Sequence, residues 1–195
     1  YNEVPVLIAA AMQTDAAVIA LHLTRPPITI PDRVKLGIPS HFAAAKGAYL
    51  IRDYAPGKPK QGVVMVNGTS TVNGLISLLP ALEKEGLNVK IICLTSYELF
   101  SRQPQAWREA LLPWGEWQDS MVITNGGLIN MNQWLANKVC ADYSLSADKD
   151  QQWRAGGSVD EVMEEAGLAP HHLLAGIRKF TGERVQRLAR VTATA

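Results

Sequence analysis

Thr24 and Arg25 are the residues whose position most directly suggests chemistry. They follow the apolar run AVIALHL at residues 17–23, which predicts a buried strand, and the two prolines after them end regular structure. An arginine at the end of a strand presents a planar fork of donors that suits a phosphate or a carboxylate. The sequence therefore offers Arg25 as an anion-binding residue. The alternative is that Arg25 is simply the first solvated residue after the strand.

The segment NGTSTVNG at residues 67–74 is a second candidate for anion binding. It joins a predicted strand to a predicted helix through a glycine turn, and the N-terminus of such a helix can bind phosphate. The spacing is not GxGxxG, however, and the lysine of a P-loop is absent. The favoured interpretation is therefore a tight turn capped by Thr71, and a Rossmann-like nucleotide site is the alternative.

The histidines and cysteines show no spacing typical of a metal or nucleophilic site. His22 falls inside the predicted strand and is interpreted as a core residue. His171 and His172 fall in the first turn of a predicted helix, where positive charge is unfavourable, and we interpret them as neutral surface or interface residues. Cys93 and Cys140 lie in apolar surroundings and are predicted to be core residues of a protein from a reducing compartment.

The composition is typical of a globular domain. The 195 residues include 19 lysines and arginines and 18 aspartates and glutamates, and the resulting net charge of +1 argues against a nucleic-acid partner. One basic excess lies at residues 178–190; a solvated helix explains it, and an acidic partner is the alternative. The chain has no apolar run long enough to cross a membrane and no secretory signal, so we expect a cytoplasmic location without a membrane partner.

Strands that alternate with helices predict the fold class. Apolar runs predict strands at 47–54, 62–68, 89–95, 119–127 and 141–147, the first of them at a sheet edge. Helical spacing, caps and turn residues predict helices at 5–14, 71–85, 104–113, 131–140, 158–166 and from Pro170 onward. Because most of these strands are nearly all apolar, we expect an α/β protein whose mostly parallel sheet is covered on both faces.

Two further details of the sequence make structural predictions. Pro80 lies inside the helix predicted at 71–85 and should kink it. Trp114 and Trp117 flank Gly115 in a predicted loop and are candidates for an oligomer contact, with core packing as the alternative.

The order of several motifs resembles the C-terminal part of transketolase. ALHLTR, followed by a proline-rich crossing, resembles the end of that family's pyrimidine-binding domain. KGAYLIRDY, VVMVNGTS, SYELF and WREALLP resemble successive parts of its C-terminal domain, and EVMEEAGLAPHHLLAGIRKF resembles its closing helices. The resemblance covers about residues 17–112 and 158–180.

The resemblance implies both a fold and a division of the chain. The expected fold is a three-layer α/β/α Rossmann-like domain with a mostly parallel five-stranded sheet and one antiparallel edge strand. The implied divisions are the tail of the pyrimidine-binding domain at 1–24, a crossing linker at 25–45, the transketolase C-terminal domain at 46–180 and a helical extension at 181–195.

The resemblance also implies a function. The intact enzyme would use thiamine diphosphate and Mg²⁺ to move a two-carbon ketol unit between sugar phosphates, as in the pentose phosphate pathway. Arg25, with Thr24 beside it, would bind the phosphate of the sugar. The GDG…Asn motif that binds the diphosphate and metal in that family is absent here, so this part alone should bind no cofactor and should be inactive. It would serve the organisation of a homodimer or the contact with the remaining domains.

The chain departs from the family pattern at several positions. RPP at 25–27 stands where RQN is usual, and MVITNGG at 121–127 lacks a glutamate that is common in VAVEAG. The related thiamine enzymes that decarboxylate 2-oxo acids or make deoxyxylulose phosphate share this last domain, so they remain alternatives. A third alternative is an interaction module that has kept the fold without catalysis.

Overall fold

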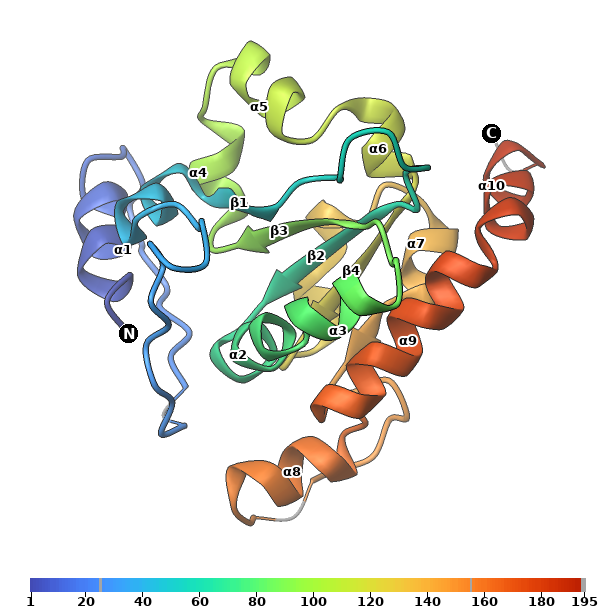
Figure 1. The fold of residues 1–195 in the computed structure, drawn as a ribbon. Coiled ribbons are helices and arrows are strands. Elements are labelled where there is room, and N and C mark those ends of the chain that lie inside the picture. Colours follow the sequence, from blue (N-terminus) through green and yellow to red (C-terminus); the bar gives the residue numbers. More distant parts are fainter. Residues whose placement is uncertain (25, 155, 194–195) are drawn as a thin grey trace.

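Five strands form the centre of the computed structural model, which describes residues 1–24, 26–154 and 156–193 (Figure 1). Their order across the sheet is β1-β3-β2-β4-β5, and β1 is antiparallel to β3 while the other pairs are parallel. The five strands are β1 (Ala48–Arg52), β2 (Val63–Asn67), β3 (Lys90–Leu94), β4 (Ser120–Thr124) and β5 (Leu145–Ser146). The mostly parallel five-stranded sheet with one antiparallel edge strand is therefore confirmed.

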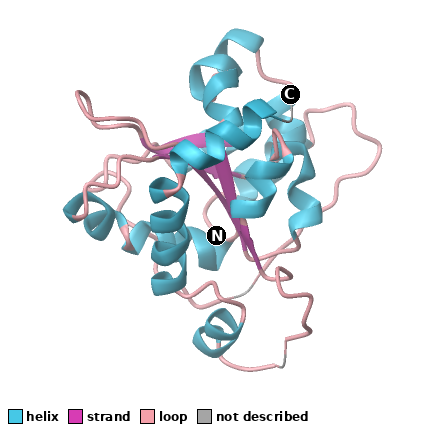
Figure 2. Ribbon diagram, turned by 90° about the vertical axis from the view of Figure 1, so that its right-hand side faces the viewer, coloured by secondary structure: helices cyan, strands magenta, loops and turns pink. Residues whose placement is uncertain are grey.

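Helices lie on both faces of this sheet, so the expected three layers are present (Figure 2). The segments between the strands form α2 (Thr69–Ser77), α3 (Leu79–Lys84), α4 (Tyr97–Ser101), α5 (Gln105–Leu111), α6 (Trp114–Gln118), the 3₁₀ helix η2 (Leu128–Trp134) and α7 (Lys138–Tyr143). The flanking segments form α1 (Val4–Ala11), the 3₁₀ helix η1 (His41–Lys46), α8 (Val159–Glu165), α9 (Pro170–Gly182) and α10 (Arg184–Ala193). Among the described residues no helix is both long and apolar enough to cross a membrane.

Alternate residues of each central strand pack in the two cores on opposite faces of the sheet. Because both faces are buried, the sequence of each strand is a continuous apolar run. Val64 and Val66 of β2 pack in the core under α2, α3 and α9, together with Leu173 of α9. Val63 and Met65 of the same strand pack in the opposite core, which contains residues of α4 and η2. All four valine and methionine side chains are completely buried.

The structure corrects the strand predicted at residues 17–23. These residues are all described, form no regular secondary structure and are exposed to solvent. A strand forms only where a second backbone pairs with it, and the described residues place none beside this segment. For the same reason His22, predicted as a core residue, is exposed.

Among the other local predictions, the break at Pro80 is confirmed, whereas the N-cap of α2 and the last strand differ. The helix predicted at 71–85 is divided into α2 and α3 just before Pro80, as expected from the missing backbone donor. Gly68, rather than Thr71, is the N-cap of α2, and the Thr71 hydroxyl donates to the carbonyl of Gly68 at 3.1 Å. Residues 141–143 belong to α7, so the strand predicted at 141–147 shrinks to β5.

Candidate functional site

Thr24 and Arg25 were the binding residues predicted from sequence, and only Thr24 is described. Thr24 lies in an exposed stretch without regular secondary structure, and Arg25 lies outside the described residues. The role of both residues in phosphate binding stays a prediction. The structure does describe the contacts of the segments on either side of them.

A cluster of three side chains fixes the N-terminal segment to the sheet. Oε1 of Glu3 accepts hydrogen bonds from NH2 of Arg33 at 2.6 Å and from the hydroxyl of Tyr49 at 2.7 Å. Arg33 also donates to the carbonyl of Pro39 at 2.9 Å, and its guanidinium lies 5.3 Å from the centre of the Tyr49 ring. Burial raises the pKa of Tyr49, so its hydroxyl stays protonated and remains a donor. The cluster joins the start of the chain, the crossing segment and β1.

We expect Glu3→Ala to loosen this attachment, because Arg33 and Tyr49 would lose their shared acceptor. A lost charge-assisted hydrogen bond corresponds to about a tenfold increase in local opening. Limited trypsin digestion should then cleave after Arg33 or Lys35 about ten times faster. Glu109→Ala is the control, because Glu109 is exposed and its hydrogen bond is with Gln105 of the same helix. Equal cleavage rates in both variants would contradict the anchoring role.

Two further contacts bracket Thr24. The hydroxyl of Tyr1 donates to the carbonyl of Pro26, which is itself buried. On the other side, NH2 of Arg102 in the domain lies 2.6 Å from Oδ1 of Asp15, and this hydrogen bond lowers the pKa of the aspartate. Asp15, before Thr24, is therefore paired with the domain, and Pro26, after it, is joined to Tyr1 at the start of the chain.

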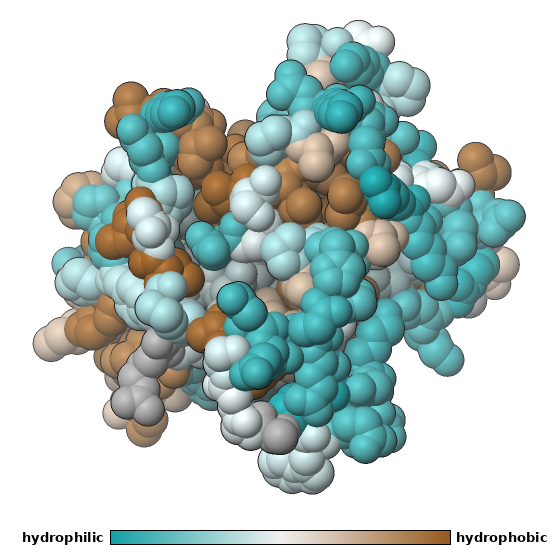
Figure 3. Space-filling model, turned by 60° about the horizontal axis from the view of Figure 1, so that its bottom comes forward, coloured by the Kyte–Doolittle hydropathy of each residue, from teal (hydrophilic) through white to brown (hydrophobic). Residues whose placement is uncertain are grey.

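The segment between these contacts exposes many apolar side chains. Val18 and Leu23 retain 83% and 62% of their accessible surface, although valine and leucine are normally buried. Further exposed apolar residues of the N-terminal part are Met12, Ile19, Leu21, Ile30, Val34, Leu36 and Phe42. Figure 3 shows apolar surface gathered on the side of the molecule where this N-terminal part lies, whereas the opposite side is mainly hydrophilic. Such a large apolar surface is typical of an interaction site.

The carboxyl edge of the parallel strands is the second polar region predicted from sequence. The amide of Asn67, at the end of β2, donates to the carbonyl of Leu94 at 3.1 Å and accepts from the hydroxyl of Thr124 at 3.2 Å. Gly68 has a φ of +96°, and a Cβ at this position would lie 1.8 Å from Oδ1 of Asn125. These contacts join the ends of β2, β3 and β4, so the residues of the glycine turn have a structural role.

Asp148, which follows β5 at the same edge of the sheet, also has a structural role. Its Oδ1 accepts from the hydroxyl of Ser146 at 2.7 Å and from the backbone N–H of Leu128 at 3.0 Å. The hydrogen bond from Ser146 is the main reason that the pKa of Asp148 lies below its usual value. The side chains of Asn67 and Asp148 at this edge are therefore both used in hydrogen bonds that join neighbouring segments of the domain.

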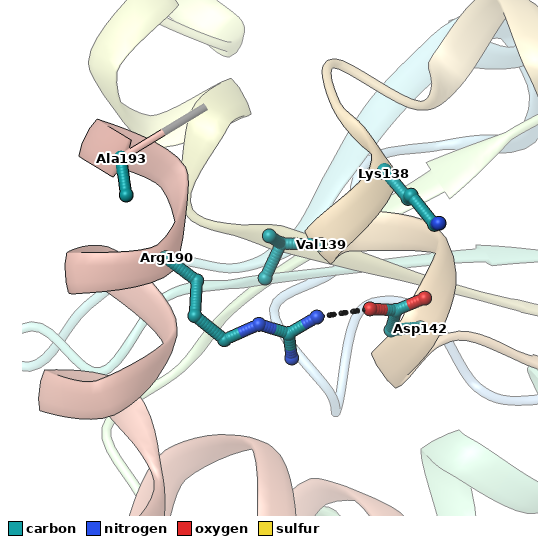
Figure 4. A pocket seen from close by; sticks show the side chains of 5 residues that line it. All are labelled: Lys138, Val139, Asp142, Arg190 and Ala193. Atoms are coloured by element: carbon teal, nitrogen blue, oxygen red, sulfur yellow. Dashed lines mark hydrogen bonds and ion pairs between the residues drawn. The ribbon is translucent and has the colours of Figure 1, made fainter. Parts of the chain in front are cut away.

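The basic residues of α10 are paired with acidic residues of the domain. Arg187 of α10 is almost completely buried, and it forms an ion pair with Asp119, which also pairs with Arg184 at 2.7 Å. Arg190 forms an ion pair with Asp142 of α7 across a shallow pocket (Figure 4). The prediction of a solvated cationic helix is thus wrong for Arg187: α10 docks on the domain, and the positive charge finds its partners within the chain.

Both cysteines are buried, whereas the two tryptophans of α6 differ in their exposure to solvent. Cys93 and Cys140 are buried, as predicted, and burial raises the pKa of the Cys93 thiol to about 12. Trp114 and Trp117 lie on α6 rather than in a loop. Trp117 donates from Nε1 to the carbonyl of Trp134 at 2.7 Å and packs against the core, whereas Trp114 retains 64% of its surface. Only Trp114 of this pair remains a candidate for an oligomer contact.

Comparison with known proteins assigns the family. The family described as transketolase-like TK C-terminal domain matches residues 47–149, which is more than half of the chain. This chain belongs to that family. The match covers the whole described sheet from β1 to β5, so the transketolase-like resemblance of the sequence motifs is confirmed.

Individual transketolases agree with this assignment. The transketolase of Aquifex aeolicus is 31% identical over 112 residues, which are 57% of this chain and 16% of that protein. Transketolase 7 of Craterostigma plantagineum is 34% identical over 95 residues, which are 47% of this chain and 14% of that protein. The chain therefore spans less than a fifth of the length of these relatives.

Solved transketolase structures share the fold. The Leishmania mexicana enzyme superposes with a TM-score of 0.58 at 18% identity, over 75% of this chain and 19% of that one. The Campylobacter jejuni enzyme superposes with a TM-score of 0.52 at 18% identity, over 69% of this chain and 18% of that one. The three-layer architecture is thus that of the transketolase C-terminal domain.

The groups that hold the N-terminal segment are not evident from the sequence. Glu3, Arg33 and Tyr49 lie 16 to 46 residues apart in pairs, and no local pattern links them. The one available signal was the presence of Glu3 and Arg33 as opposite charges in otherwise apolar or proline-rich segments.

Proposed function

We propose that this chain is the C-terminal portion of a transketolase-type transferase, which moves a two-carbon ketol unit between sugar phosphates. Membership of the C-terminal domain family and the transketolase relatives support the proposal. Because the chain spans less than a fifth of those relatives, the proposed reaction would require a larger assembly of which this chain is one part.

The exposed apolar segment before Thr24 is the observation that carries this proposal. Residues 1–24 would be the tail of the pyrimidine-binding domain, and Val18, Leu21 and Leu23 would be buried once that domain is complete. Residues 25–45 would be the crossing linker, 46–180 the C-terminal domain and 181–195 its helical extension. Pairing of 17–23 with strands of the preceding domain would also give the segment the strand conformation that its sequence favours.

The same arrangement gives Thr24 and Arg25 their proposed role. Both residues would lie where the pyrimidine-binding domain ends, next to the attachment made by Pro26 and Tyr1. The guanidinium of Arg25 would donate two parallel hydrogen bonds to the phosphate of the sugar substrate, and the hydroxyl of Thr24 would donate a third. These contacts bind and orient the substrate and take no part in bond breaking.

Thiamine diphosphate and Mg²⁺ would supply the chemistry of ketol transfer from the rest of the enzyme. The residues of this chain do not fit the cofactor, because the sequence has no GDG…Asn motif. The Asn67 amide and the Asp148 carboxylate at the polar edge of the sheet also already form hydrogen bonds within the chain. We therefore assign no catalytic residue to this part. Its contribution would be subunit organisation through contact with the remaining domains or with a second copy.

Arg25→Ala in the full-length enzyme is expected to raise the KM for a phosphorylated donor about 100-fold, because charged hydrogen bonds contribute roughly 1.5–3 kcal/mol. The KM for an unphosphorylated ketose should stay within about twofold of wild type, since it lacks the group that Arg25 binds. Steady-state ketol transfer with both donors provides the measurement. Arg178→Ala is the control, because Arg178 is paired with Glu85 on the surface of α9.

The outcomes separate this proposal from its alternatives. Equal effects on both donors, or no effect on either, would rule out Arg25 as the phosphate-binding residue. Activity of the full-length wild type on 2-oxo acids instead of sugar phosphates would point to the related decarboxylating thiamine enzymes. Stable self-association without any response to thiamine diphosphate would point to an interaction module.

A further inference from the structure

Three metal-ligating side chains meet where α8 is joined to α9. Glu164 comes from α8, while His171 and His172 are in the first turn of α9. Oε1 of Glu164 lies 3.3 Å from Nε2 of His171 and 3.1 Å from Nε2 of His172. One ligand atom from each residue lies within 4.8 Å of the other two, and the imidazole centroids are 4.0 Å apart. The three donor atoms thus lie close enough together to bind one metal ion, outside the region assigned to substrate binding.

The backbone, rather than the cluster itself, brings these side chains together. Gly167 has a φ of +66° and donates to the carbonyl of Glu164 at 3.0 Å, while the N–H of Leu168 donates to the carbonyl of Met163 at 2.8 Å. This hydrogen-bonded turn ends α8, and Pro170 begins α9 directly after it. The Leu168 side chain is buried, which fixes the turn to the domain.

The spacing of the donors suits a tetrahedral zinc ion. Zinc bonds of about 2.0–2.1 Å to nitrogen and oxygen place neighbouring ligand atoms roughly 3.4 Å apart in a tetrahedron. The two distances to Glu164, 3.1 and 3.3 Å, are close to this value. We propose that Glu164, His171 and His172 bind one Zn²⁺, with water as the fourth ligand. Two imidazoles and a carboxylate are a donor set that zinc uses in proteins, whereas Mg²⁺ prefers oxygen ligands alone.

Zinc bound here would attach α8 to the rest of the domain. The side chains of α8, all of which lie in the described residues, are only partly buried or exposed. The Glu164, His171 and His172 side chains retain 56%, 65% and 39% of their surface, so the metal can reach them from solvent. The Glu164 carboxylate also offsets the unfavourable placement of a cation at the N-terminus of α9. The ion would therefore act as a cross-link between two helices, independent of ketol transfer.

The test is a titration of the 195-residue chain with Zn²⁺ in the presence of excess Mg²⁺, in which isothermal titration calorimetry measures the stoichiometry and the affinity. We expect one Zn²⁺ per chain, and at least about 100-fold weaker binding in each of Glu164→Gln, His171→Ala and His172→Ala, since even outer-shell changes cost 10–100-fold. The other two histidines provide matched controls: His22→Asn and His41→Asn should bind Zn²⁺ like the wild type. Co²⁺ should give the visible absorption of a tetrahedral site in the wild type and the controls alone.

Zn²⁺ should also raise the thermal unfolding midpoint of the wild type and leave that of Glu164→Gln unchanged. Far-UV circular dichroism of the three variants verifies that they are folded, which we expect because all three positions are accessible to solvent. Zn²⁺ binding that survives Glu164→Gln, depends on His22 or His41, or is not saturable at one ion per chain would overturn the proposal.

Discussion

Asp119→Ala is expected to lower the free energy of unfolding by about 3–5 kcal/mol, which is the usual cost of removing one partner of a buried ion pair. Arg187 retains only 1% of its surface and has Asp119 as its acidic partner, while its other hydrogen bonds are to the carbonyl of Phe180. Without the carboxylate, the buried guanidinium would have no acidic partner. Its Cζ atom lies 3.5 Å from the centroid of the Phe180 ring. Urea unfolding followed by tryptophan fluorescence measures this loss.

Two control variants test whether that loss of stability is specific to the buried ion pair between Asp119 and Arg187. Arg187→Met should be less damaging than Asp119→Ala, because Asp119 would keep Arg184 as a partner and the methionine would fill the apolar site. Arg178→Ala should leave the urea midpoint nearly unchanged, because its pair with Glu85 lies at the surface. A loss of less than about 1 kcal/mol in Asp119→Ala would contradict the docking of α10 described above.

Gly47→Ala is expected to cost about 3 kcal/mol or more, from the sum of a left-handed backbone and overpacking. Gly47 has a φ of +84°, and a Cβ there would lie 2.2 Å from the backbone nitrogen of Phe100 and from the carbonyl oxygen of Ser96. The Gly47 carbonyl also accepts hydrogen bonds from the N–H groups of Thr95 and Ser96 at 2.9 and 3.0 Å. The residue therefore holds the start of β1 against the turn between β3 and α4, where backbone atoms cannot move aside.

Gly86→Ala is the control that separates the backbone cost of this substitution from its packing cost. Gly86 has a similar φ of +67°, but a Cβ at that position would meet no atom within 4 Å. It should therefore show only the backbone cost of about 1 kcal/mol. The difference between the two unfolding free energies then reports the close approach at Gly47, and equal losses in both variants would contradict it.

The central strands could be predicted because their sequences carry the signal locally. Both faces of β2, β3 and β4 are covered, so each strand is a run of apolar residues bounded by turn residues. The division at Pro80 was predictable for a similar reason, since proline removes a backbone donor whatever surrounds it. The same local logic failed at 17–23, because strand formation there depends on a backbone partner that the described residues do not supply.

The site was harder to predict because its contacts join distant residues. The sequence indicated Arg25 and Thr24 through a strand end, but the anchors around them, such as Glu3 with Tyr49, arise from the fold. The basic residues at 178–190 looked like a solvated face because sequence spacing does not reveal that Asp119 lies opposite Arg187. The proximity of Glu164 to the two histidines is not evident from the sequence for the same reason, since Glu164 stands seven residues before His171 on a different helix.

Ketol transfer by the full-length protein that carries this chain tests the central proposal most directly. With a ketose phosphate donor and an aldose phosphate acceptor, we expect two-carbon transfer that requires both thiamine diphosphate and Mg²⁺. Absence of transfer under these conditions, from a folded full-length protein, would contradict the assignment of this chain to a transketolase-type enzyme.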